Sequence, residues 1–257
     1  MNGRKKYGAA VISAALTLAL AGGYAYAATQ HFADSTTDEA WDSWVQKWEG
    51  QMSTDYEKIS LTPGADETQM NFAWYSKADG TATPRIELST NSNMSGASVF
   101  EGGASQAIDG YMSNKVTAEA LKENTTYYYR YYNNGSPSQT ASFKTHSFSS
   151  YSMLYVGDPQ IGASKGQTTS RGDKLENASA LNTAARNDAF SWNKTLNTAM
   201  AANPDISFVL SAGDQINKNV EGRDPGNEVE YAGFLGADWM PSLPAVITFI
   251  NTARPCT

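Results

Sequence analysis

The sequence predicts two domains, an all-β sandwich followed by an α/β domain. Two observations favour this division. Residues 59–146 contain short runs of alternating apolar and polar residues separated by turn signals, which is the pattern of a β-sandwich. Residues 150–257 alternate apolar runs of strand length with stretches of helical periodicity, which is the pattern of a parallel sheet with helical crossovers. A chain of 257 residues is long enough for two domains of modest size.

Residues 1–27 have the features of a secretory signal peptide. Basic residues at positions 4–6 precede a run of small and apolar residues at 7–20, and Ala25-Tyr26-Ala27 is typical of a cleavage site. We therefore expect a mature chain that starts near Ala28 and is secreted or held at the cell surface. The apolar run is shorter than the roughly 20 residues that a membrane-spanning helix needs. An uncleaved signal segment is therefore the only membrane contact that we expect.

Residues 28–58 are predicted to form an N-terminal helical segment. Trp41, Trp44 and Trp48 recur at helical spacing with acidic residues between them, and polar N-cap candidates precede them. We predict an amphipathic helix within residues 34–58 whose Trp face packs on the body of the protein, because amphipathic helices usually bury their apolar face. Contact of this face with carbohydrate or a membrane is the alternative.

Six segments of the first domain are predicted to be strands. Each alternates apolar and polar residues or is rich in β-formers, and turn signals such as Asp79-Gly80 and Asn133-Asn-Gly135 lie between them. The segments are Ile59–Leu61, Met70–Tyr75, Arg85–Leu88, Asn114–Val116, Tyr127–Tyr132 and Ala141–Lys144. In the tyrosine-rich segment, we expect alternate rings to face the core and the others to shield an outer face.

The second domain is predicted to alternate strands and helices around one parallel sheet. In chain order we predict a strand at 151–156, a polar loop at 162–173, a helix at 187–202, a strand at 206–210, a polar loop at 215–227, a helix at 228–235 and a third strand at 245–250. The first helix has four candidate packing residues, namely Phe190, Trp192, Leu196 and Met200.

Two of these predicted strands end in Gly-Asp. Such apolar runs are typical of buried strands, and ligand sites of open α/β sheets lie beyond the carboxyl ends of the strands. Asp158 and Asp214 would therefore face one crevice, and their carboxylates are suitable ligands for a divalent or trivalent metal ion. The alternative is that each Asp is only a turn former or helix cap.

Composition narrows the remaining classes of function. Acidic residues outnumber basic ones by 26 to 19 and no basic stripe is visible, which argues against nucleic acid as a partner. Cys256 is the only cysteine, so we expect neither an intrachain disulfide nor a cysteine-based metal site. The two histidines, His31 and His146, lie outside the predicted second domain. No Gly-rich phosphate loop follows either strand, which argues against a nucleotide-binding domain.

The order of these pieces resembles that of the purple acid phosphatase type of metallophosphoesterase, in which a fibronectin-like domain precedes a calcineurin-like phosphoesterase domain. The first domain resembles the family through Ile59–Gly64, Asn71–Ser76 and Leu121–Arg130. The second does so through Gly157–Gln160 and Ser211–Gln215, and the match covers about residues 59 to 245. The fibronectin-like stretch also implies that the Tyr127 hydroxyl bonds to backbone upstream of it.

The resemblance implies a phosphatase that acts on phosphate monoesters with two metal ions, which are Fe, Zn or Mn. Asp158 would bind the first metal ion and Asp214 would bridge both. Gln160 occupies a position where relatives often have a histidine ligand. Asn217 occupies the position of a tyrosine in the purple members, so we do not expect the purple colour. The candidate metal ligands that the resemblance implies are thus Asp158, Gln160, Asp214 and Asn217, together with Asn251 further along the chain.

The sequence departs from the family after the second motif. Asn251 can stand for the asparagine of a Gly-Asn-His motif, but Ile250 and Thr252 replace its neighbours, and no later histidine motif follows. We therefore expect the first half of an α/β metallophosphoesterase domain in a C-terminally truncated chain that is inactive by itself; a frameshift is one origin of such a truncation, and a natural early stop is another. A half-sheet would leave an apolar face uncovered. The alternatives are a secreted β-sandwich binding module and a non-functional fragment.

Overall fold

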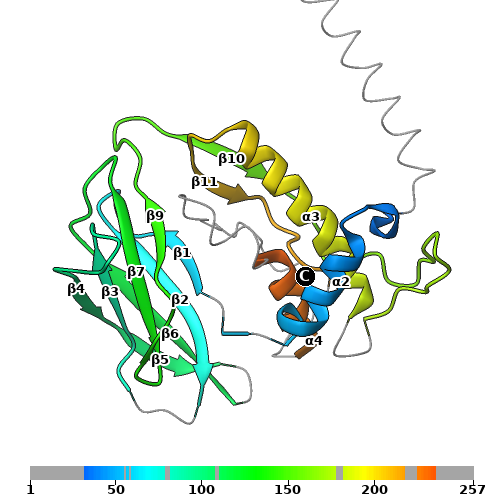
Figure 1. Cartoon of the computed structure of the whole chain (residues 1–257), viewed down its shortest axis with the longest axis horizontal. Helices are drawn as coiled ribbons and strands as arrows, with labels where there is room; N and C mark the ends of the chain where they lie inside the picture. Colours follow the sequence, from blue (N-terminus) through cyan, green and yellow to red (C-terminus); the bar gives the residue numbers. More distant parts are fainter. Residues whose placement is uncertain are drawn as a thin grey trace, which may run out of the picture.

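The computed structural model describes residues 32–54, 56–57, 59–78, 82–107, 110–177, 182–217 and 225–235. Several predictions lie outside these residues: the signal peptide, His31, the third strand at 245–250, Asn251 and Cys256. Within them the chain forms a β-sandwich and, beside it, a body of helices around a short parallel sheet (Figure 1). In the part of the chain that is described, no helix is long and apolar enough to cross a membrane.

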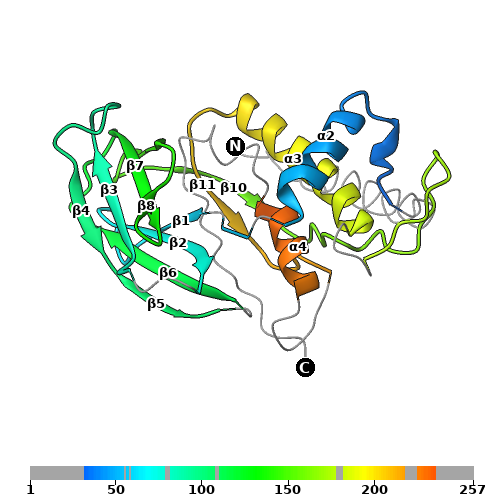
Figure 2. The ribbon, with the colours of Figure 1, turned by 60° about the horizontal axis from the view of Figure 1, so that its bottom comes forward.

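The β-sandwich consists of nine strands in two sheets (Figure 2). One sheet has the order β1-β2-β6-β5, and the other has the order β4-β3-β7-β8 with β9 paired to β7. The strands are β1 (Ile59–Pro63), β2 (Met70–Lys77), β3 (Arg85–Ser89), β4 (Ser98–Glu101), β5 (Gly103–Gln106), β6 (Tyr111–Ala118), β7 (Thr126–Asn133), β8 (Ser136–Pro137) and β9 (Ala141–Lys144).

All six predicted strands are present, but three further strands were missed. β5 is exposed along its whole length and β4 is nearly so, since both are edge strands of their sheets. A strand that buries no side chains shows no alternation of apolar and polar residues, so the sequence pattern cannot reveal it. β8 has only two residues and completes the turn after β7.

The sandwich core is made of side chains that alternate along its central strands. On β2, Met70, Phe72 and Trp74 are buried and the residues between them are only partly so. The Phe72 ring contacts the Tyr129 ring edge to face at 5.3 Å. Tyr127 and Tyr129 are buried, whereas Tyr132 lies on the outer face under the Arg85 guanidinium. The expected alternation of the tyrosine rings is therefore confirmed.

The implied hydrogen bond of Tyr127 is also present. Its hydroxyl oxygen accepts from the backbone N–H of Lys122 at 2.8 Å. This bond links the start of β7 to the loop before it, and the buried ring stacks on Phe143 of β9 at 5.5 Å.

The N-terminal helical segment is shorter and less regular than predicted. It comprises the 3-10 turn η1 (Ser35–Thr37), helix α2 (Trp41–Lys47) and a π-helical turn, η2 (Trp48–Met52). The Asp34 side chain caps η1 by accepting from the backbone N–H of Thr36, whereas α2, the helix for which the polar cap was expected, begins after Ala40 without a side-chain cap. The π-helical turn widens the helix, and Trp44, Trp48 and Met52 all remain buried through it.

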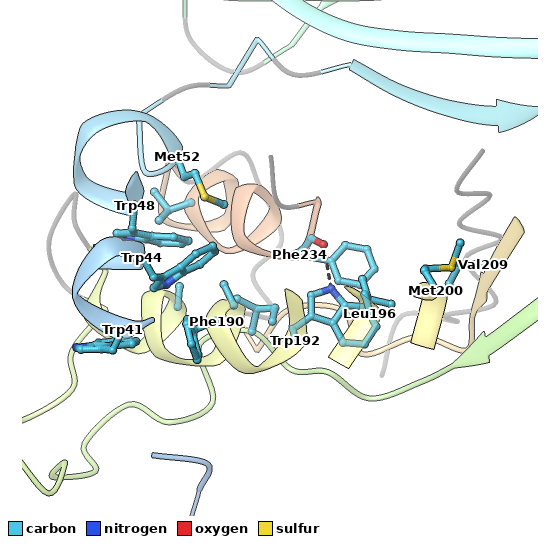
Figure 3. Close-up of a cluster of buried hydrophobic side chains, with 14 of the residues drawn as sticks. Trp41, Trp44, Trp48, Met52, Phe190, Trp192, Leu196, Met200, Val209 and Phe234 are labelled. Carbon is cyan, nitrogen blue, oxygen red and sulfur yellow. Dashed lines mark hydrogen bonds between the residues drawn. The ribbon is translucent and has the colours of Figure 1, made fainter. Parts of the chain in front are cut away.

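The Trp face packs on helix α3 (Thr183–Ala202), which confirms the packing prediction (Figure 3). Trp41 and Trp44 contact the Phe190 ring edge to face at 5.6 and 5.8 Å. The indole N–H of Trp44 donates to the backbone oxygen of Arg186 at 2.9 Å. The segment that precedes the sandwich in sequence is thus built into the core of the α/β region.

The α/β region consists of β10 (Ser152–Val156), α3, β11 (Ile206–Ser211) and α4 (Pro225–Leu235). β10 and β11 pair in parallel, as predicted. α3 begins four residues earlier than predicted, since the Asn182 side chain caps it by accepting from the N–H of Ala185. Its four predicted packing residues are all buried, and Trp192 stacks on Phe234 of α4 at 5.4 Å (Figure 3).

The prediction that β10 is a buried strand is wrong for one of its faces. Tyr151, Met153 and Tyr155 are 67%, 47% and 65% exposed. Leu154 and Val156, on the other face, pack against the cluster of α2, α3 and α4. The helices cover one face of this sheet only, so the expectation of an uncovered apolar face is confirmed for the described residues.

Candidate metal site at the ends of the parallel strands

Two loops are joined by backbone hydrogen bonds just beyond the carboxyl ends of β10 and β11. The N–H groups of Asp158 and Gln160 donate to the carbonyls of Gly213 and Asp214, at 3.2 and 2.8 Å. Further along, the N–H of Asn217 donates to the carbonyl of Ile161 at 3.0 Å. The parallel pairing therefore continues past the strands and brings the two predicted loops side by side.

Four of the five predicted metal ligands lie on these two loops. They are Asp158, Gln160, Asp214 and Asn217; Asn251 lies outside the described residues. Asp158, Asp214 and Asn217 are exposed and Gln160 is partly buried. Oxygen donors that remain in solvent can be recruited by a cation at a low desolvation cost.

Three of these residues have a left-handed backbone. The φ angles of Asp158, Gln160 and Asp214 are +57°, +40° and +47°. Residues other than glycine rarely adopt this region, although the short polar side chain of Asp tolerates it better than most. Backbone strain of this kind persists where surrounding structure enforces it, and it is concentrated at functional sites. No sequence pattern predicted the strain at Gln160.

Glycines explain how the loops come so close. A Cβ atom on Gly157 would lie 3.2 Å from the Cβ of Ala212 on the other loop, so a larger residue would push the loops apart. Gly213 has a φ of +109°, a conformation that side chains disfavour. Gly213 therefore lies in a bend after β11, whereas Gly157 allows the close approach of the first loop to Ala212.

A cavity of about 660 Å³ lies beside the first loop. Asp158 and Gln160 line it, together with Asp188, Ser164, Ser191 and Trp192 among others. Asp214 and Asn217 are not among its lining residues, so the structure joins the two loops but places only the first against this cavity. A second cavity of about 290 Å³ lies between the sandwich and α4, and none of the predicted ligands lines it.

Asp188 of α3 is a site residue that sequence reasoning missed. Its Oδ2 atom accepts from the backbone N–H groups of Gly162 and Ser164, at 2.8 and 3.1 Å. Burial raises the pKa of Asp188, although these hydrogen bonds oppose the rise. One signal was available: Asp188 lies four residues before Trp192, which places an acidic residue on the apolar face of the predicted helix.

The donors fit a hard cation but form only part of a two-metal site. Two carboxylates and two side-chain amides offer oxygen atoms, which suit hard cations. Within the described ranges, no group of three or more His, Cys, Asp or Glu side chains lies close enough to hold a metal ion. His146 follows β9 and lines neither cavity, as expected of a residue outside the site.

The family model of the purple acid phosphatase N-terminal domain matches residues 56–145, the range of β1 to β9. Purple acid phosphatase PPD1 from seeds of yellow lupin (Lupinus luteus) has a similar structure, with 16% identity and a TM-score of 0.50. The match covers 75% of this chain and 34% of the lupin chain. The likeness to PhoD covers 77% of this chain and 39% of that one, with 11% identity and a TM-score of 0.46.

This chain thus spans between a third and two fifths of the length of these two structures. No curated protein matches the sequence. Residues 56–145, which match the family model, are the residues that fold as the two-sheet sandwich, and the lupin enzyme shares the fold over a larger part of the chain. The β-sandwich of this chain is therefore similar to the purple acid phosphatase N-terminal domain.

Proposed function

We propose that the α/β region carries the first two metal-binding loops of an exported, metal-dependent phosphatase. Asp158, Gln160, Asp214 and Asn217 would donate oxygen atoms to Fe, Zn or Mn ions, and Asn251 would join them. A phosphate monoester is the substrate of such a site. The observation that carries this proposal is the joining of the two Gly-Asp loops by backbone hydrogen bonds, with three predicted ligands in a left-handed backbone.

The residues of this chain have separate roles in the proposed site. The carboxylates of Asp158 and Asp214 supply negative charge, and the amides of Gln160 and Asn217 supply neutral oxygen donors. When bound, the metal ions would polarise the phosphate ester. The cavity beside Asp158 and Gln160 has about 660 Å³, which lies within the range of small-molecule sites, roughly 300–1,000 Å³.

From the set of oxygen donors we propose that the chain alone binds metal ions but hydrolyses phosphate esters slowly or not at all. A two-metal site needs more ligands than two carboxylates and a few amide oxygens, and relatives use histidine where this chain has Gln160. Amide oxygen is a weaker donor than imidazole for Fe or Zn. We therefore expect phosphate release by this chain alone to be low or absent.

A titration with Mn²⁺ tests the proposal. Electron paramagnetic resonance would measure the free Mn²⁺ left by the full chain and by its Asp158→Asn and Asp214→Asn variants. Asparagine tolerates a left-handed backbone, so each change removes the charge with little effect on the loop. Asp205→Asn is the matched control, because Asp205 is exposed and precedes β11 at the opposite end of the sheet.

We expect each loop variant to weaken Mn²⁺ binding more than about tenfold and the control to leave it unchanged. Equal binding by all four proteins would contradict the assigned ligands. If the unchanged chain binds no Mn²⁺ while its sandwich is folded, the sandwich becomes the working part and a binding module is the better account. Release of phosphate from an aryl phosphate, measured on the same samples, separates binding from turnover.

A further inference from the structure

We propose that Asp188 is a positioning residue that holds the Gln160 loop in its metal-binding conformation. This inference rests on the proposed metal function of that loop. The Asp188 Oδ2 atom accepts two backbone hydrogen bonds, from Gly162 at 2.8 Å and from Ser164 at 3.1 Å. The donors lie two and four residues after Gln160 in the chain, so the carboxylate closes the turn that begins at this ligand.

The turn presents its N–H groups to one oxygen atom. The N–H of Ala163 donates to the carbonyl of Gln160 at 2.9 Å, so the chain reverses just after the ligand. Gly162 has a φ of +104°, which allows its own N–H to face Asp188. Hydrogen bonds to an ionised carboxylate are roughly twice as strong as those between neutral groups. A carboxylate is therefore better suited than an amide to hold this turn.

The opposite side of the turn is closed by α4. A Cβ atom on Gly162 would lie 2.5 Å from the Oε1 atom of Glu230, whose side chain is fully buried. Gly162 is thus enclosed between an acidic side chain of α3 and one of α4. A residue larger than glycine would not fit at position 162 without displacing Glu230, and Gln160, two residues earlier, has a φ of +40°.

Asp188 is itself held by the N-terminal segment. Its Oδ1 atom accepts from the Asn187 amide at 3.0 Å, and Asn187 is fully buried. The Asn187 side chain also accepts from the N–H of Ser35 at 3.0 Å and donates to the carbonyl of Ala33 at 2.8 Å. One continuous set of hydrogen bonds therefore runs from the segment before α2 to the metal-binding loop, and such networks fix a single arrangement.

The test compares Mn²⁺ affinity with the folded state in the same full-length samples. We would measure Mn²⁺ binding by electron paramagnetic resonance for the unchanged chain, Asp188→Asn, Asp188→Glu and the control Asp173→Asn. Asp173 is an exposed carboxylate in the loop before α3 and lines neither cavity. Near-ultraviolet circular dichroism would report the packing of the Trp cluster, and hydrogen exchange would report the amides of residues 160–165.

Asp188→Asn is expected to weaken Mn²⁺ binding about tenfold or more and to speed amide exchange in residues 160–165, with the Trp signal retained. Asp188→Glu keeps the charge, so it is expected to restore most of the affinity and the slow exchange. Asp188→Asn binding that equals that of the unchanged chain would overturn the positioning role and leave the proposed ligands intact.

Two further outcomes also decide the matter. If Asp188→Asn loses the Trp signal, Asp188→Glu becomes the deciding variant. If Asp188→Glu keeps the native Trp signal but binds Mn²⁺ as weakly as Asp158→Asn or Asp214→Asn, the need for a carboxylate at position 188 is overturned. If the unchanged chain binds no Mn²⁺ at all, the proposed metal function fails, and the inference fails with it.

Discussion

The β-sandwich and the α/β region bury their strands in different ways. In the sandwich, two sheets cover each other, and Phe72, Ile86 and Phe143 from both sheets meet in one closed core. In the α/β region, helices cover a two-stranded sheet on one face, and Tyr151 and Tyr155 remain exposed on the other. The two hydrophobic clusters share no residue.

The closed region and the open region of the chain also differ in which predicted metal ligands they carry. The sandwich is closed and carries none of the predicted ligands, whereas the α/β region is open and carries all four that are described. Non-glycine residues with a positive φ occur in both regions, so backbone strain does not distinguish them, whereas the open face of the short sheet does. We therefore expect the α/β region to be the less stable of the two and to depend more on its N-terminal helix.

The largest effect should come from Trp48→Ala. The side chain is fully buried against α3 and α4, and truncating a core aromatic costs about 3–5 kcal/mol. Hydrogen exchange during urea unfolding, read separately for the two regions, should show the loss in the α/β region only. Phe72→Ala in the sandwich is the matched control and should destabilise the sandwich only. Equal losses in both regions from either variant would mean that the chain unfolds as one unit.

Tyr127→Phe should destabilise only the sandwich, by about 1 kcal/mol. The change keeps the buried ring and removes the acceptor of the Lys122 N–H, which is then left without this hydrogen bond. Urea unfolding of the sandwich would measure the effect. Tyr128→Phe, on the outer face of the same strand, is the control and should change little. A loss in Tyr128→Phe that matches Tyr127→Phe would show that the corner bond has no special role.

Acid should weaken the α/β region through Asp34. Burial raises the pKa of Asp34, but hydrogen bonds from Thr36 and Ser170 outweigh it and lower the pKa from 3.8 to about 2. Since the folded-state pKa is below the unfolded one, these bonds stabilise the region above pH 3.8 and are lost as the pH falls toward 2.

Asp34→Asn removes the titrating group and replaces one acceptor oxygen, such as the one that accepts from the Ser170 N–H, by an amide nitrogen. It should flatten this part of the stability profile and cost about 1 kcal/mol at neutral pH. Thermal unfolding between pH 2 and 6 would measure both effects. Parallel profiles for the two proteins would contradict the contribution of Asp34.

The smallest effect is expected on the open face of β10. Tyr155→Thr keeps β propensity and removes an exposed ring, so stability should change by less than about 0.5 kcal/mol while self-association decreases. Leu154→Thr, one residue away on the covered face, should be clearly destabilising. Sedimentation and urea unfolding would distinguish them. If both variants lose the same stability, the face of Tyr155 is covered in solution.

The features that the sequence predicted correctly are those that depend on residues close together in the chain. Alternation along β2 and the Trp spacing of α2 both depend on neighbouring residues, and both were confirmed. The exposed edge strand Gly103–Gln106 has no pattern to detect, because no face of it is buried. The open face of β10 was read as buried since an apolar run carries no information on how many layers cover it.

Long-range contacts explain what the sequence missed at the site. The role of Asp188 depends on its hydrogen bonds with Gly162 and Ser164, which are 26 and 24 residues away in the chain. The left-handed backbone of Gln160 depends on the second loop, whose Asp214 carbonyl accepts its N–H. Residue types, spacing and the family resemblance predicted the candidate ligands, and the fold shows which backbone contacts hold their loops.

The most direct test of the account is whether the two loops form one metal site. A double-mutant cycle would compare Mn²⁺ affinity in the unchanged chain, Asp158→Asn, Asp214→Asn and the double variant. If both carboxylates serve one site, each single change weakens binding more than about tenfold, and the double change costs much less than the sum of the two. Losses that simply add, or single changes without effect, would contradict a shared site.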